Sequence, residues 1–168
     1  MPPASKNAIR QLAYSIRKQL GLINEAYFPV LEFIEYVLPE IDSRFNYEIV
    51  PDTAIGLDAA NYNPSENTMR IRQSVYEGAC EGNGRDRFTI AHEIGHYLMH
   101  RDVNLALSRL ENHTQVPAYQ NSEWQANTFA SALLMPPYLI GGWNPRQIAK
   151  YCGTSLRAAE IAYKEKKK

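Results

Sequence analysis

The sequence predicts an α+β fold that is mainly helical and carries one small antiparallel β-sheet. Three observations point to this class. Apolar residues recur at helical spacing in several segments, a block rich in β-branched and aromatic residues occupies residues 45–76, and turn-forming residues separate these parts. With 168 residues, 45% of them hydrophobic, the chain can bury one core, and nothing in it indicates a second large domain.

Helical periodicity predicts two helices before the sheet. The first covers residues 5–20 and ends at Gly21, and the second is short and lies between Pro29 and Pro39. We expect Pro39 to end the second helix, because proline has no backbone N–H to donate.

The β-rich block supplies the expected strands, in "FNYEIVPD", "IGLDAANYN" and "TMRIRQSVY". The turn formers of "NPSEN" predict a hairpin near residues 62–68. The next segment, "GACEGNGRD", is expected to be a loop that leads into a helix capped by Asp86.

The later part of the chain predicts more helices. After a long polar stretch, "EWQANTFASALLM" has helical spacing and ends at two prolines, and two short helices are expected around "CGTS". We therefore expect a main domain over residues 1–140 and a short helical extension over residues 141–168, packed on the same domain.

Charge and targeting signals restrict the class of protein. Eighteen Lys and Arg residues balance eighteen Asp and Glu residues, so no overall field draws the chain to nucleic acid or to an anionic membrane. The sequence contains no signal peptide and no apolar run of about 20 residues. A cytoplasmic protein with reduced cysteines at 80 and 152 is expected.

The stretch "RFTIAHEIGHYLMHRD" contains the candidate metal-binding and catalytic residues. Residues four apart on a helix share a face, so His92 and His96 can present ring nitrogens to one zinc ion. Glu93 lies beside that face without joining it, which suits a carboxylate that takes a proton from the attacking water. This is the HExxH signature of metallopeptidases. Scattered histidines on an ordinary amphipathic helix are the alternative. Zinc is the expected cofactor, although manganese or iron also suit such ligands.

His100 does not complete the metal site. On a straight helix it lies roughly 12 Å along the axis from His92, too far for a shared ion. A site of the HExxHxxGxxH type, in which a glycine turns the chain so that a third histidine reaches the ion, is excluded, because Asp102 occupies the position of that histidine. We expect His100 to be a structural residue or a support near the cleft mouth.

The third ligand is expected from the later helix. Glu123 begins "EWQAN", and Asn127 lies one turn further on the same face. Glu123 is the best-placed acid to bind the metal, while Asn127 can accept the Nδ1–H of His92 and fix which nitrogen faces the ion. A helix-terminal acid favoured by the macrodipole is the alternative for Glu123. Gly95, which has no side chain, is expected to let another backbone pack close to the histidine helix.

Two segments, "RFTIAHEIGHYLMH" and "EWQANTFASALLMP", resemble the ImmA/IrrE-type zinc metallopeptidases nearly position for position over residues 87–136. The resemblance implies a zincin-like metallopeptidase fold, with His92, His96 and Glu123 as zinc ligands and Glu93 as the catalytic acid/base. Asn127 stands where relatives often carry Asp, so it would raise the basicity of His92 less.

Members of that family are bacterial or phage proteins, and the resemblance implies action on helix-turn-helix repressors. Many members carry a repressor-like DNA-binding domain, for which this chain has no room before residue 40. A separately encoded repressor or antitoxin-like protein is therefore the implied substrate, which places the chain in transcription regulation or a toxin–antitoxin pair.

Three functions compete. The first is a zinc endopeptidase that makes a limited cut in such a protein, with Tyr119 and His113 as candidate donors to the oxyanion. The second is a toxin–antitoxin component that acts by docking, with little or no proteolysis. The third is DNA binding by the last two helices, with Lys164 and residues 166–168 on phosphates. The intact HEIGH motif favours the first, and overall neutrality argues against direct nucleic-acid binding.

Overall fold

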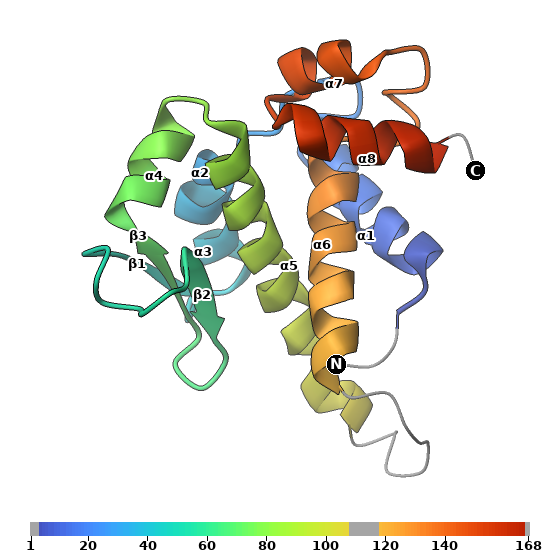
Figure 1. The fold of residues 1–168 in the computed structure, drawn as a ribbon. Coiled ribbons are helices and arrows are strands. Elements are labelled where there is room, and N and C mark those ends of the chain that lie inside the picture. The colour runs from blue at the N-terminus through green and yellow to red at the C-terminus, as the bar shows by residue number, and fades with distance from the viewer. Residues whose placement is uncertain (1–3, 108–117, 167–168) are drawn as a thin grey trace.

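The structure is a computed structural model that describes residues 4–107 and 118–166. For residues 100–107 and 118–121 it describes the backbone alone. It confirms the predicted α+β, mainly helical class (Figure 1). In chain order the elements are α1 (Lys6–Gln19), α2 (Val30–Glu32), the π-helical turn η1 (Phe33–Val37), α3 (Leu38–Ile41), β1 (Asn46–Val50), β2 (Ala60–Asn63), β3 (Thr68–Arg72), α4 (Gln73–Cys80), α5 (Gly84–Leu107), α6 (Ala118–Leu134), α7 (Pro145–Cys152) and α8 (Leu156–Lys166).

Helices α5 and α6 lie side by side at the centre of the molecule, with the sheet and α4 on one side and α1 on the other (Figure 1). The expected close approach at Gly95 is confirmed. A Cβ atom on Gly95 would lie 3.0 Å from Cδ1 of Phe129 and 3.2 Å from Cα of Ala126, so only glycine lets α6 pack this closely without a shift. The histidine helix is thereby held against the helix that carries Glu123.

The sheet has three strands in the order β1-β3-β2, and it is mixed rather than antiparallel. The expected hairpin is present, with β2 antiparallel to β3, but β1 runs parallel to β3. The prediction of an antiparallel sheet is therefore right for the hairpin and wrong for β1. The structure instead places β3 in the centre, because its Met69 and Ile71 side chains are fully buried, and leaves the more exposed β1 at an edge.

Three local predictions about helices are wrong. Helical structure continues past Pro39 to the end of α3, because the wider π-helical turn η1 immediately before it accommodates a residue without an N–H. The segment 73–80, predicted in part as a loop, forms α4, because Val75 and Ala79, one turn apart, are both buried in the core. The cap of α5 is Asn83 rather than Asp86, since the Asn83 Oδ1 accepts the N–H of Asp86.

Two buried arginines, Arg17 and Arg87, tie the helices together, and we call them the arginine anchors. Arg17 donates to the carbonyls of Leu133 at 2.7 Å and Leu22 at 3.1 Å, joining α1 to the end of α6. Burial lowers the pKa of both guanidinium groups below the ordinary value for arginine. Their hydrogen bonds to carbonyls satisfy these buried charges.

Arg87 connects α5 to segments far away in the chain. Its guanidinium donates to the carbonyls of Phe28 and Gly153, both at 2.9 Å, and to that of Cys152 at 3.3 Å, and it stacks over the ring of Tyr27. The loop before α2 and the turn between α7 and α8 are therefore fastened to the first turn of the histidine helix.

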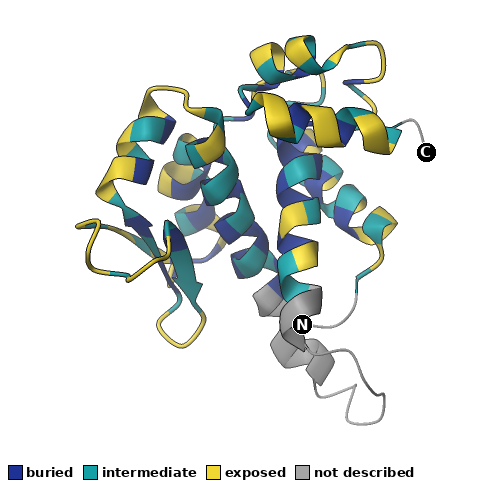
Figure 2. Cartoon of the chain, viewed as in Figure 1, coloured by how far each residue is buried: buried dark blue, intermediate teal, exposed yellow. Residues whose placement is uncertain are grey.

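Burial is concentrated on α5, α6 and the faces packed against them, whereas the outer turns of α4, α7 and α8 are exposed (Figure 2). Helix α7 begins with a capping box, in which Asn144 and Gln147 each accept a backbone N–H from the other. Within the described part of the chain, no helix has the length and apolar character needed to span a membrane.

Candidate metal centre

The candidate metal centre lies where α5 and α6 face each other. His92 and His96 are one helical turn apart on α5, and Glu123 and Asn127 are one turn apart on α6. Because the two helices run in opposite directions, His96 meets Glu123 and His92 meets Asn127. Packing of the two helices thus brings four polar side chains from two segments together.

Three of these side chains form a triangle at this point, with one nitrogen from each histidine and both carboxylate oxygens of Glu123 close together. The Nε2 atom of His92 lies 3.2 Å from Oε2 of Glu123, the Nε2 atom of His96 lies 3.0 Å from Oε1 of Glu123, and the two Nε2 atoms are 3.0 Å apart. A tetrahedral ion with bonds of about 2.0–2.1 Å places its ligand atoms about 3.3 Å from one another. The observed triangle is close to that size.

The chemistry of these donors also fits a cation. Nδ1 of His92 lies 3.0 Å from Oδ1 of Asn127, and an amide oxygen only accepts, so the ring donates its Nδ1–H there. The Nε2 atom of a neutral His92 is then left with a lone pair, directed at the carboxylate of Glu123 and the ring of His96. Electron-rich atoms this close need a shared proton or cation between them. Two imidazoles and one carboxylate are a donor set that suits zinc.

Glu93 lies beside this triangle and is 7% exposed. Burial, chiefly, and the negative charge of Glu123 raise the pKa of its carboxyl to about 8, while a hydrogen bond with the backbone of Tyr62 in β2 acts in the opposite direction. A carboxyl with a pKa near neutrality can both take and return a proton. Asp58 adds a smaller negative contribution to the same shift.

The sequence model of the family Peptidase_M78, described as the IrrE N-terminal-like domain, matches residues 49–140, a span that contains β2, β3, the HEIGH motif and Glu123. The chain belongs to this family. The family assignment confirms the resemblance drawn from the two sequence segments and makes the chain a member of a peptidase family.

A search of solved structures gives the fold of this family member a wider context. A Mycobacterium tuberculosis transcriptional regulator matches with a TM-score of 0.63 at 13% sequence identity, over 90% of this chain and 44% of that protein. At this identity the likeness shows a shared fold, and the chain spans less than half the length of the regulator. No curated protein matched the sequence.

The remaining predicted site residues can be placed only in part. Asn127 contacts His92 as expected, although its role in metal binding stays a prediction. The side chains of His100 and Tyr119 and all of His113 lie outside the described residues, so their predicted roles stay predictions. The backbone of Tyr62 was not anticipated as a neighbour of Glu93, because no local pattern links a strand to a helix 30 residues later.

Proposed function

We propose that this family member is a zinc-dependent endopeptidase that makes limited cuts in a regulatory protein, a helix-turn-helix repressor or an antitoxin-like partner. The observation that carries the proposal is the convergence of His92, His96 and Glu123 beside the buried carboxyl of Glu93. The regulatory substrate is supported by the family resemblance and, as context, by the fold shared with a transcriptional regulator.

In this proposal each residue has a separate task. His92, His96 and Glu123 would hold the ion, which when bound supplies a Lewis acid and lowers the pKa of water. Glu93 takes a proton from the attacking water while the water oxygen bonds to the scissile carbonyl carbon. It then gives that proton to the amide nitrogen of the substrate as the C–N bond breaks. Asn127 orients the His92 ring by accepting its Nδ1–H.

The electrostatics of Glu93 agree with this division of tasks. Its pKa is raised partly by the neighbouring charge of Glu123. The charged form that a general base requires is favoured when a divalent cation offsets that charge. Burial then keeps the pKa near the pH at which a peptidase works, so that the carboxyl can also return its proton.

The test uses the Glu93→Gln variant and the repressor-like or antitoxin-like protein encoded beside this chain. We expect the wild-type protein with zinc to release a discrete fragment, and a chelator to prevent it. Glu93→Gln should cut at least about 10³-fold more slowly, because it cannot accept a proton, while its zinc affinity stays within about threefold of wild type. Cleavage is followed by gel electrophoresis and mass spectrometry, and zinc by competition with a chromophoric chelator.

Glu160→Gln, an exposed glutamate on α8, is the matched control and should cut at the wild-type rate. An undiminished rate in Glu93→Gln would refute the role of Glu93. Stable copurification with the partner and no fragment at saturating zinc would favour the docking function instead.

DNA binding by α7 and α8 has less support. The ammonium group of Lys166 donates to the carbonyls of Ile140, Gly141 and Trp143, so this cation holds the chain before α7 against the end of α8. Helix α8 buries Ala159 and Ala162. A salt-sensitive shift of a DNA fragment by the purified protein would revive this function.

A further inference from the structure

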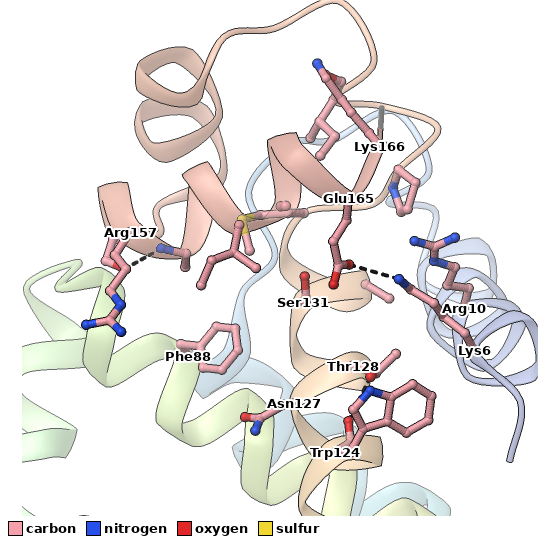
Figure 3. Close-up of a pocket in the computed structure, with 18 of the residues that line it drawn as sticks. Lys6, Arg10, Phe88, Trp124, Asn127, Thr128, Ser131, Arg157, Glu165 and Lys166 are labelled. Carbon is pink, nitrogen blue, oxygen red and sulfur yellow. Dashed lines mark hydrogen bonds and ion pairs between the residues drawn. The ribbon is translucent and has the colours of Figure 1, made fainter. Parts of the chain in front are cut away.

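A groove with a volume of about 460 Å³ lies between α1, α5, α6 and α8, next to the candidate metal centre (Figure 3). Binding clefts commonly have volumes of roughly 300–1,000 Å³. The groove is formed only when α8 lies across the α5–α6 pair, so it joins the last helix of the chain to the helices that carry the site.

The floor of the groove is apolar. Phe88 from α5, Met135 beyond α6, and Ala158 and Ile161 from α8 all line it. Two of its large side chains are open to solvent, since Trp124 is 46% exposed and Ile161 is 53% exposed. Such a concave apolar surface gains free energy when a partner's apolar side chains cover it.

The rim of the groove is positively charged at both ends. Figure 3 shows Arg157, near the start of α8, and Arg10, on α1, at opposite ends of the groove. Arg85 lines the groove from the first turn of α5, and its neighbour Gly84 packs against Ser155, just before α8. Among the described residues, none of these three guanidinium groups has an ion-pair partner. The one acidic lining residue, Glu165, already pairs with Lys6 at 3.2 Å. The groove therefore presents unpaired cations around an apolar floor.

The groove reaches the candidate metal centre. Trp124 follows the predicted ligand Glu123 directly in the chain, and Asn127 both lines the groove and contacts His92. Figure 3 shows both side chains at the end of the groove opposite α8. A substrate segment bound in the groove would thus lie next to the converging nitrogen and oxygen atoms of His92, His96 and Glu123.

We propose that this groove is a docking site for a segment of the protein substrate, an apolar stretch with acidic residues on both sides. The inference rests on the proposed peptidase function and adds a substrate class to it. Charge complementarity selects the occupant, because acidic residues can pair with Arg10 at one end and with Arg85 and Arg157 at the other.

The test measures binding separately from cleavage, in the Glu93→Gln protein. The probe is a fluorescein-labelled peptide with a central Ala-Leu-Phe-Ala-Leu segment and two glutamates at each end, compared with a peptide that carries lysines in place of the glutamates. By fluorescence anisotropy we expect the acidic peptide to bind at least about tenfold more tightly than the basic one at low salt. Equal affinities, or no binding of either peptide, would overturn the proposal.

Variants then locate the bound peptide. Arg85→Glu combined with Arg157→Glu should weaken binding of the acidic peptide at least about tenfold, whereas Arg146→Glu, an equally exposed arginine on α7 outside the groove, should change it less than about twofold. Ser131→Phe should also weaken binding, because the ring fills the floor. If that variant does not fold, the charge variants decide the question, and equal effects of the groove and control variants would overturn the proposal.

Two further outcomes distinguish the groove proposal from the peptidase proposal and from a dimer interface. Binding that follows these expectations, with no cleavage of any partner at saturating zinc, would keep the groove and refute the peptidase. A dimer of the free protein that dissociates when Arg85 and Arg157 are reversed would assign the groove to a second copy of the chain and overturn the proposal.

Discussion

The arginine anchors and the candidate metal centre both gather polar side chains around α5 and α6, but they differ in burial and in how these side chains are paired. Arg17 and Arg87 direct N–H donors at backbone carbonyls, so each buried charge meets its complement. At the metal centre, the Nε2 atoms of His92 and His96 face each other and the carboxylate of Glu123, so only a shared proton or a cation can complement them. Burial of a charged group therefore does not by itself mark a functional site, and the pairing of donors with acceptors distinguishes the two regions.

The comparison has an energetic meaning. Anchors that donate to backbone carbonyls contribute to the folded state of the metal-free chain, and their removal leaves buried carbonyls without donors. At the metal centre, electron-rich nitrogen and oxygen atoms that face one another lower the stability of the folded protein until a cation binds among them. A chelator should therefore change the effect of variants at the metal centre and leave the effect of anchor variants unchanged.

The largest expected effect is on the anchor side. Arg87→Met removes donors from the carbonyls of Phe28, Cys152 and Gly153 and should lower the free energy of unfolding by about 3–5 kcal/mol, with or without a chelator. Urea unfolding followed by circular dichroism measures this. Arg146→Met, at an exposed position, should stay within about 0.5 kcal/mol of wild type. A small loss in Arg87→Met would show that these hydrogen bonds are dispensable.

The next effect concerns the metal centre, where a substitution should leave the stability of the metal-free protein unchanged or raise it. In a chelator, Glu123→Gln should unfold at the same urea concentration as wild type or a higher one, because it removes a negative charge that faces Glu93. Zinc at a hundredfold excess over its dissociation constant should stabilise the wild-type protein by about 2.7 kcal/mol, and the same zinc concentration should stabilise Glu123→Gln by less than about 1 kcal/mol. Equal zinc stabilisation of both proteins would remove Glu123 from the ligand set.

The smallest effect concerns the support of a ligand. Asn127→Ala removes the acceptor for the Nδ1–H of His92 and should lower zinc affinity about tenfold, whereas Asn127→Asp should retain or raise it, because a carboxylate is the stronger acceptor. Competition with a chromophoric chelator measures both affinities. If alanine and aspartate lowered zinc affinity equally, the contact between residue 127 and His92 would not orient the ligand.

Sequence reasoning reached those parts of the site that depend on local geometry. A helix places residues four apart on one face wherever it lies, so the pairing of His92 with His96 followed from the HEIGH motif alone. Glu123 and Asn127 were also named as partners of the histidines, and the structure brings them together. Sequence reasoning did not predict contacts between residues that are distant in the sequence, such as the one between Tyr62 and Glu93.

The sequence by itself determined the mainly helical α+β class, the family and the spacing of the histidines, because periodicity and short motifs act over a few residues. Only the tertiary structure decided that β1 pairs parallel to β3, that residues 73–80 form a helix, and that three arginines with no ion-pair partner among the described residues line an apolar groove. These features depend on which apolar surfaces cover one another when α8 crosses α5 and α6. That choice is made by the whole packed core, and no segment of the chain encodes it alone.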